Sequence, residues 1–185
     1  MSERVHPASA REVAARLSDA GLDEIDGLLE RYGDDPRKQV QHAVAVARRR
    51  RDREAAERDR VSAMYDLQHE LGGDGVVLGV DEVGRGAIAG PLTVCAVALP
   101  ANPRIWGLND SKQLTPARRE ALAARIAEVA TAIGIAHIEP ASIDAVGMSS
   151  ALRMAMANAI EDTGVDPDCV LIDGNPVHVH PREKT

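Results

Sequence analysis

The chain has 185 residues, of which 44% are hydrophobic and 28% charged, and its formal net charge is −7. This composition is typical of a globular protein with one core, or with a small accessory module and a domain, and the net charge argues against indiscriminate nucleic-acid binding. No apolar run approaches the roughly 20 residues of a membrane span, and the start lacks a signal-peptide apolar region, so we expect a cytoplasmic protein with no membrane partner.

The first part of the chain has the pattern of three helices. Residues 9–12 have the Ser-x-x-Glu form of a capping box and predict a first helix that ends before Gly21. A second helix is predicted from about 24 to 32. A third, long helix is predicted from Pro36, with Asp35 as its cap, to a stop at 72–73. We therefore expect an all-helical N-terminal extension over residues 1–72.

The long helix carries a local basic patch. Between Pro36 and Arg60 nine basic residues face four acidic ones, in a chain that is acidic overall. One interpretation is a solvated helix surface held by pairs of opposite charge at i,i+4 spacing. The other is a helix that follows a phosphate backbone, which would make binding depend on salt.

Beyond the Gly72–Gly75 joint the pattern changes to alternating strands and helices. The predicted fold class is α/β, a mixed β-sheet flanked by helices over residues 73–185. The elements expected are strands at 76–80, 92–99, 133–138 and 169–173, a helix at 116–130 capped by Thr115, and a helix that starts at Ser142 or Asp144 and ends at Gly164.

Two smaller features complete this part of the chain. Cys95 and Cys169 lie in apolar runs without metal-site or redox spacing, so we expect both to be reduced residues of the core. Residues 177–180, Val-His-Val-His, are expected to form an exposed tail, although two imidazoles at i,i+2 would also suit a metal on a strand.

Three acidic residues follow apolar strands and are candidate metal ligands. Asp81 and Glu82 close the first predicted strand, and Asp173 closes the fourth. If these strands are neighbours, three carboxylates converge, and carboxylate oxygens suit Mg²⁺ or Mn²⁺ together with the oxygens of a phosphate. Gly84-Arg85-Gly86 then adds a close-approaching backbone and a positive side chain. The competing interpretation is a plain tight turn with a surface ion pair.

Three motifs in this order resemble the type 2 ribonuclease H family. They are Asp81-Glu82-Val83-Gly84-Arg85-Gly86 with Ala89-Gly90-Pro91, Asn109-Asp110-Ser111-Lys112-Gln113-Leu114, and Leu171-Ile172-Asp173-Gly174-Asn175. Residues 35–41 are also similar to the helical extension that some bacterial members place before the catalytic domain.

The resemblance implies a ribonuclease H-like fold and an endonuclease that depends on Mg²⁺ or Mn²⁺. Its substrate would be an RNA/DNA hybrid, or duplex DNA that contains single ribonucleotides. Asp81, Glu82 and Asp173 would hold the metal and carry catalysis. Gly84, Arg85 and Gly86 would sense the 2′-hydroxyl and the adjacent phosphate, with Lys112 as a further phosphate contact. We expect a monomer.

The resemblance also implies residues beyond position 185, among them a fourth acidic ligand and a ribose-contacting tyrosine. We therefore expect 73–185 to be a C-terminally incomplete catalytic domain, and these 185 residues alone to have little or no activity. The alternative function is a catalytically impaired form that only binds hybrid or ribonucleotide-containing duplex. A further alternative is a sheet that does not fold stably.

Overall fold

The computed structural model describes residues 8–87, 89–173 and 176–185. The chain forms two compact units, Met1–Val61 and Ser62–Thr185, which are described separately below. Their division falls inside a long helix, whereas the predicted domain boundary lies at the end of that helix and stays a prediction. Gly174 and Asn175 of the third motif lie outside the described residues.

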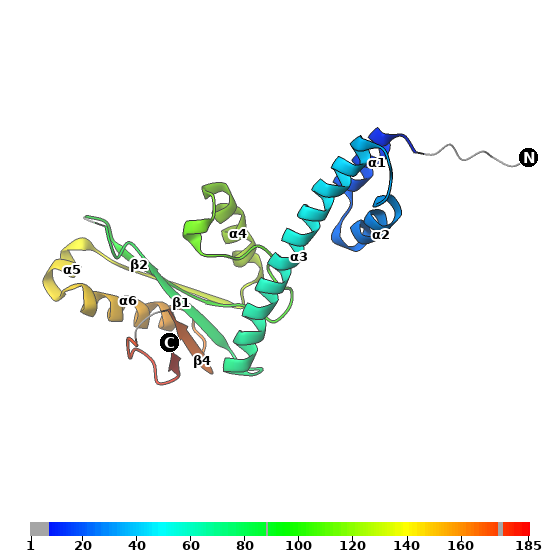
Figure 1. Cartoon of the computed structure of the whole chain (residues 1–185). Coiled ribbons are helices and arrows are strands. Elements are labelled where there is room, and N and C mark those ends of the chain that lie inside the picture. Colours follow the sequence, from blue (N-terminus) through cyan, green and yellow to red (C-terminus); the bar gives the residue numbers. More distant parts are fainter. Residues whose placement is uncertain (1–7, 88, 174–175) are drawn as a thin grey trace, which may run out of the picture. The chain divides into compact units, whose positions relative to one another are not determined.

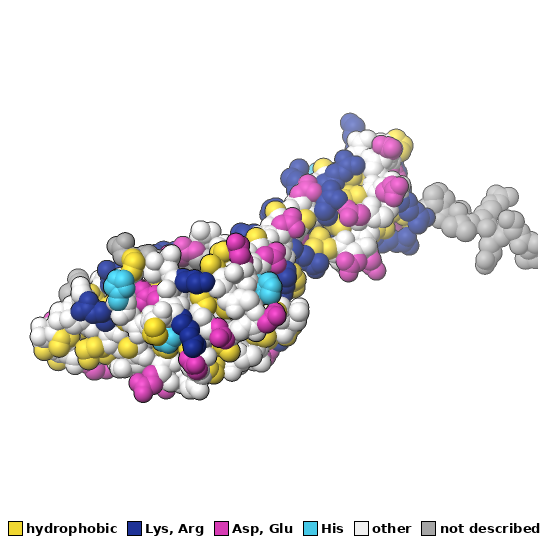
Figure 2. All heavy atoms as spheres, turned by 90° about the horizontal axis from the view of Figure 1, so that it is seen from below, with side chains coloured by type: hydrophobic (Ala, Val, Ile, Leu, Met, Phe, Trp, Pro, Cys, Tyr) yellow, Lys and Arg dark blue, Asp and Glu magenta, His cyan; other side chains and the backbone are white. Residues whose placement is uncertain are grey.

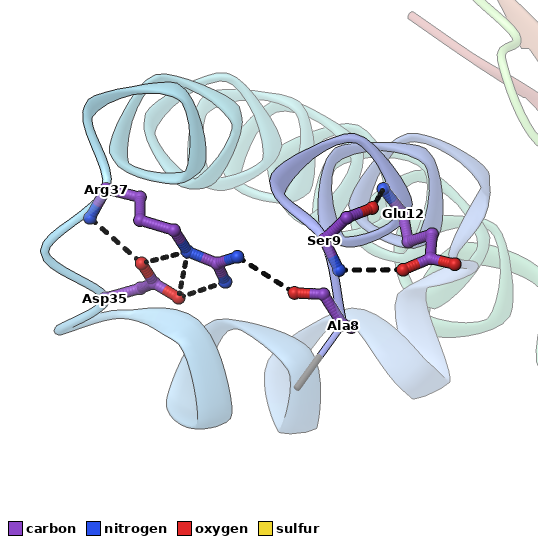
Figure 3. Close-up of polar contacts among 5 residues, drawn as sticks. All are labelled: Ala8, Ser9, Glu12, Asp35 and Arg37. Carbon is purple, nitrogen blue, oxygen red and sulfur yellow. Dashed lines mark hydrogen bonds and ion pairs between the residues drawn. The ribbon is translucent and has the colours of Figure 1, made fainter. Parts of the chain in front are cut away.

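The N-terminal unit is helical, as the sequence predicts. It contains α1 (Ala10–Asp19), α2 (Leu22–Tyr32) and the first part of α3 (Lys38–Gly72). The capping box at the start of α1 is confirmed: the Ser9 hydroxyl accepts from the Glu12 N–H at 3.2 Å, and the Glu12 carboxylate accepts from the Ser9 N–H at 2.7 Å (Figure 3). The three helices bury a shared apolar core that includes Val13, Leu17, Ile25, Leu29, Val40 and Val44.

The start of α3 differs from the prediction. The helix begins at Lys38, not at Pro36, and the Asp35 carboxylate binds both the backbone and the side chain of Arg37, the residue before the helix (Figure 3). The Asp35 carboxylate accepts from the Arg37 backbone N–H at 3.0 Å and from its guanidinium at 2.6 Å, and this guanidinium also donates to the Ala8 carbonyl at 2.8 Å. The hydrogen bonds from the Arg37 side chain and backbone lower the pKa of Asp35 to about 2. The Asp35–Arg37 pair thus joins the α2–α3 turn to the residues before α1.

The C-terminal unit is built on a mixed five-stranded sheet, so the predicted α/β fold class is confirmed. Its strands are β1 (Val77–Val83), β2 (Leu92–Ala98), β3 (Ala132–Ile138), β4 (Cys169–Ile172) and β5 (Glu183–Lys184). The spatial order is β3-β2-β1-β4-β5; β1 is antiparallel to β2 and parallel to β4. The first and fourth predicted strands are therefore neighbours.

One face of the sheet is covered by α6 (Met148–Asp162), which packs on β1, β2 and β3 (Figure 1). Along β2 every second side chain is buried in this interface, as expected for a strand with one face in the core. The main cluster of buried residues in the C-terminal unit lies here and includes Leu78, Leu92, Val94, Val170, Ala155 and Met156. The remaining helices are α4 (Pro116–Val129), which begins at the predicted Thr115 cap, and α5 (Pro140–Val146).

The single helix predicted from Ser142 or Asp144 to Gly164 is wrong in its start and its continuity. The helix begins at Pro140 and is interrupted at Gly147, whose φ of +80° ends α5 and precedes α6. Glycine adopts this conformation without the steric cost that a β-carbon imposes. Gly147 therefore separates two helices where the sequence predicted one.

The exposed tail predicted at 177–180 is also wrong. Val177 and Val179 are partly buried against the main core, and the chain returns along β4 as the short strand β5. His178 has a φ of +59°, so it is not part of a strand that could present two imidazoles on one side. No helix among the described residues is long and apolar enough to cross a membrane.

Candidate active site

The acidic residues meet at adjacent strands. β1 and β4 run parallel, and their last paired residues are Val80 and Ile172. Asp81 follows Val80 within β1 and Asp173 directly follows Ile172, the last residue of β4, so they lie side by side at the same level of the sheet. The prediction that Asp81 closes its strand is wrong in one respect. β1 continues through Glu82 to Val83 because it keeps its antiparallel pairing with β2, in which Asp81 lies opposite Cys95.

Negative charge accumulates around Asp81. Loss of hydration raises the pKa of the Asp81 carboxyl, and the charges of Glu82 and Asp173 raise it further. A hydrogen bond of 2.8 Å from the Glu82 backbone N–H acts in the opposite direction but is outweighed. Three carboxylates therefore interact across two neighbouring strands, and a bound cation would relieve their repulsion.

The three carboxylates are near one another but are not assembled as a ligand set. Within 8–87, 89–173 and 176–185, no three His, Cys, Asp or Glu side chains form a group that could hold a metal ion. The interaction of the three charges is compatible with the lack of a ligand set among the described residues. Charges interact over longer distances than a metal–oxygen bond, which is about 2.0–2.1 Å for Mg²⁺. The donor chemistry fits a divalent cation, and the geometry requires side-chain movement on binding.

The Gly-Arg-Gly segment forms a tight turn directly after β1. The Ala87 N–H donates to the Gly84 carbonyl at 3.0 Å. Gly84 has a φ of +91°, and a β-carbon there would lie 2.4 Å from the Pro91 carbonyl oxygen, so this position requires glycine. At Gly86 a β-carbon would meet nothing within 4 Å, so packing alone does not require glycine there.

Arg85 extends from this turn towards solvent. Its side chain is 62% exposed, and one of its guanidinium nitrogens lies 3.4 Å from a Glu82 carboxylate oxygen. An exposed pair of this length contributes little to stability. The predicted surface ion pair is thus present, but it leaves the guanidinium accessible to a phosphate.

Lys112 lies in a separate, locally organised loop. The Asp110 carboxylate accepts from the Lys112 N–H at 2.9 Å and caps a short 3-10 helix, Ser111–Gln113. Arg119 of α4 holds the same loop by donating to the Ser111 and Leu114 carbonyls at 3.1 and 2.8 Å. Lys112 is exposed, and its ammonium group has no hydrogen bond to Asp81, Glu82 or Asp173 within the described part of the chain. The sequence pointed to Lys112 but missed Arg119, since nothing in the loop indicates which helix residue holds it.

A largely apolar cavity of about 750 Å³ lies beside the acidic residues. It is lined by Asp81 and Asp173, by Cys95 and Val97 of β2, and by apolar side chains of the last turns of α3 that include Leu67. Cys169 is buried as predicted, but Cys95 is only half-buried because it faces this cavity and not α6. Partial burial raises the pKa of the Cys95 thiol.

Several basic residues of the patch on α3 form ion pairs and hydrogen bonds with nearby residues. Arg51 pairs with Asp26 and with Asp52, and Arg60 pairs with Glu57 at 2.6 Å. Arg50 donates to carbonyls at the end of α1, including that of Ala20 at 2.6 Å. In Figure 2 basic and acidic side chains are mixed along the helical part next to the grey N-terminal trace. These contacts favour the solvated-helix interpretation for the paired residues, whereas a phosphate-binding role stays a prediction.

Comparison with known protein families gives two matches that together cover most of the chain. Residues 78–185 match the profile described as Ribonuclease HII, and residues 9–72 match the profile described as Ribonuclease HII N-terminal domain. Both the resemblance predicted from the three motifs and the similarity of the helical extension to that of bacterial members are thereby confirmed.

Curated relatives agree with these matches. A Ribonuclease HII from Listeria monocytogenes serotype 4b is 40% identical over 156 residues, which is 83% of this chain and 60% of the relative. One from Geobacillus kaustophilus is 38% identical over 171 residues (91% and 65%), and one from Moorella thermoacetica 47% over 122 residues (65% and 59%). The chain thus spans about three fifths of the length of the curated relatives that it matches.

Among solved structures, the ribonuclease H2 from Pyrococcus horikoshii OT3 aligns with a TM-score of 0.48 and 26% identity, covering 55% of this chain and 52% of that one. The assignment rests on the family profile, which matches more than half of the chain and includes Asp81, Glu82 and Asp173. The chain belongs to the ribonuclease HII family.

Proposed function

We propose that this chain carries the acidic site of an endoribonuclease that cuts the RNA strand of RNA/DNA hybrids, or cuts at single ribonucleotides in duplex DNA. The observation that carries the proposal is the raised pKa of Asp81, caused by burial and by the like charges of Glu82 and Asp173 on adjacent strands. Crowded carboxylates that repel one another are the arrangement that a divalent cation stabilises.

The residues that would hold Mg²⁺ or Mn²⁺ are Asp81, Glu82 and Asp173. When bound, such an ion lowers the pKa of a coordinated water and neutralises charge that develops on the phosphate. The role of the chain itself is to orient these carboxylates. Its environment raises the pKa of Asp81 and so disfavours the charged form, which a bound cation would favour.

The turn after β1 would recognise the substrate. Gly84 brings the backbone close to the Pro91 carbonyl, and Arg85, paired only loosely with Glu82, would exchange this carboxylate for a phosphate. Gly86 would let the ribose approach the backbone, where a 2′-hydroxyl distinguishes RNA from DNA. Lys112 would contribute a more distant phosphate contact from its exposed position. A monomeric state and a cytoplasmic location stay predictions.

Cleavage of a labelled RNA/DNA hybrid and of a duplex with one ribonucleotide tests the proposal. Whatever Mg²⁺- or Mn²⁺-dependent cleavage these 185 residues support, we expect Asp81→Asn to reduce it by at least about 100-fold, because the asparagine cannot supply the ligand charge. Asp144→Asn, an exposed carboxylate on α5, is the matched control and should cleave like the parent chain. Cleavage that persists in Asp81→Asn would show that this acid does not hold the metal.

The second candidate function is binding of the same duplexes without cleavage. It is favoured by the lack of a preassembled group of three metal-binding side chains among the described residues. In this case the parent chain should retain hybrids in a filter-binding titration, with an affinity that falls as salt rises, and should release no cleaved product. Affinity indifferent to salt would argue against phosphate contacts.

A further inference from the structure

The segment from Pro176 to Thr185, here called the hook, is closed by one carboxylate. Glu183 Oε1 accepts from the backbone N–H groups of Val177 at 2.7 Å and His178 at 3.1 Å, and its Oε2 accepts from that of Val179 at 2.9 Å. Three successive N–H groups that converge on one anion form a backbone nest, which the positive φ of His178 makes possible.

The nest closes an unusually short connection between parallel strands. β5 pairs in parallel with β4, with Val170 opposite Glu183 and Leu171 opposite Lys184. Only ten residues, Asp173 to Arg182, connect the two strands, and no helix is found in the described part of this connection. Parallel strands usually need a dozen or more connecting residues and a helix, so the ordering energy must come from other contacts.

Those contacts fix both sides of the hook. Arg182 donates to the Asp166 carboxylate at 3.1 Å and to the Pro167 carbonyl, and the Arg182 carbonyl accepts from the Val170 N–H at 3.1 Å. Val177 and Val179 pack against the main core. The hook is therefore a closed loop whose first residues lie just downstream of Asp173 and whose last residues lie beside β4.

We propose that Glu183 is a positioning residue for Asp173: by binding residues 177–179 it stabilises β5, whose pairing with β4 supports the strand end that Asp173 follows, and so holds Asp173 beside Asp81. This role rests on the proposed function only in so far as Asp173 binds a metal. Glu183 acts through the backbone and contacts neither substrate nor metal.

Both carboxylate oxygens of Glu183 take part in this role. Burial raises the pKa of Glu183, but the hydrogen bonds from Val179, His178 and Val177 together outweigh this effect and lower it. A glutamine has one oxygen and a donating NH₂ group in place of the second, so it cannot accept from all three N–H groups in this geometry.

The test compares the metal-free parent chain with Glu183→Gln and with Glu120→Gln by NMR of the ¹⁵N- and ¹³C-labelled proteins. Glu120 is an exposed carboxylate of α4 and serves as the matched control. In Glu183→Gln we expect shifts in the amide signals of Val177–Val179, together with shifts or broadening of the amide and carboxyl signals of Asp173. Signals of β1 and β2 should stay unchanged, and Glu120→Gln should match the parent throughout.

A Mg²⁺ titration followed by the Asp173 signals then measures the consequence. We expect about tenfold weaker affinity in Glu183→Gln, the lower end of the range for lost outer-shell support of a metal ligand. Asp173 signals identical to those of the parent, despite altered signals at 177–179, would overturn the proposal. A parent chain that binds no Mg²⁺ would contradict the proposed function instead, and the metal-free spectra would still decide the role of Glu183. If Glu183→Gln loses the β1–β2 spectrum, Glu183→Asp, which keeps the charge one methylene further back, is examined in the same way.

Discussion

The ionised Asp81 carboxylate destabilises the folded chain relative to the unfolded chain, and substitution of this residue would show the effect. Because its pKa is raised, the folded state binds this proton more tightly than the unfolded state does. The stability from this group is therefore fully present below the unfolded aspartate pKa of about 3.9, and is lost as the pH rises through the folded value.

From this sign we expect Asp81→Asn to melt at a higher temperature than the parent at pH 7, and the difference to vanish near pH 3, where Asp81 is protonated in both states. Mg²⁺ should raise the melting temperature of the parent but not of the variant, since only the parent keeps the ligand. Thermal melts by circular dichroism at both pH values, with Asp144→Asn as control, measure this. An Asp81→Asn variant that is less stable than the parent at pH 7 would contradict the raised pKa of Asp81.

At single residues, the sequence predicted which acidic side chains lie near one another better than it predicted their surroundings. Two acids after apolar strands are a local pattern, and the adjacency of Asp81 and Asp173 was predicted on the condition that the two strands are neighbours, which the sheet order meets. The half-buried state of Cys95 was not predicted, because it depends on which face of β2 meets α6. The nest around Glu183 was also missed, since it joins residues through backbone N–H groups that carry no sequence signal.

At the level of elements, Arg50 shows how one residue of the basic patch serves the fold. Its guanidinium donates to the Leu17 carbonyl at 3.1 Å, to the Ala20 carbonyl at 2.6 Å and to the Ser18 carbonyl. These groups lie at the C-terminal end of α1, where carbonyls have no partner within the helix and a cation is favourable.

We expect Arg50→Gln to destabilise the N-terminal unit by about 1.5–3 kcal/mol, the usual contribution of hydrogen bonds to a charged group. Neighbouring Arg49 is exposed, so Arg49→Gln should stay within about 0.5 kcal/mol of the parent. Because two compact units need not unfold together, hydrogen exchange of the α1 amides is the appropriate measurement. Equal exchange in both variants would show that Arg50 does not cap α1.

Element boundaries were predictable where a cap is local and less so where the backbone conformation decides. Ser9 and Thr115 cap α1 and α4 as predicted, since each hydroxyl needs only an N–H three residues away. The long helix α3 begins at Lys38, two residues after the predicted start, although the Asp35 carboxylate does accept from the Arg37 N–H. Gly147 separates α5 from α6 by its φ of +80°, and a glycine in the sequence does not reveal which conformation it adopts.

At the scale of the whole molecule, the face of the sheet opposite α6 is distinctive because apolar side chains remain exposed on it. Asp81, Cys95 and Ile135 are successive partners across β1, β2 and β3, so they share this face. Ile135 is 50% exposed, and Leu67, which lines the cavity next to Cys95, is 51% exposed. Clustered apolar side chains around a cavity form a patch that favours association, whereas single exposed ones are ordinary.

We expect Leu67→Ser to lower the fluorescence of the apolar dye ANS bound to the chain, and to weaken concentration-dependent association in sedimentation velocity if the parent chain departs from the predicted monomer. The reason is that serine removes apolar surface at the rim of the cavity, where the dye or a second chain would bind. The effect on stability should be small, about 0.5 kcal/mol from helix propensity, because Leu67 is already half exposed.

The control is Met154→Ser, which removes a similarly exposed apolar side chain from α6, away from the cavity lining. If the patch acts as a unit, dye binding and association should fall only in Leu67→Ser, because an isolated side chain offers too little surface for either. Equal decreases in both variants would show that exposed area alone matters and that the cavity has no special role. A parent chain that sediments as a monomer at every concentration would instead support the monomeric state, and the patch would then be measured by dye binding alone.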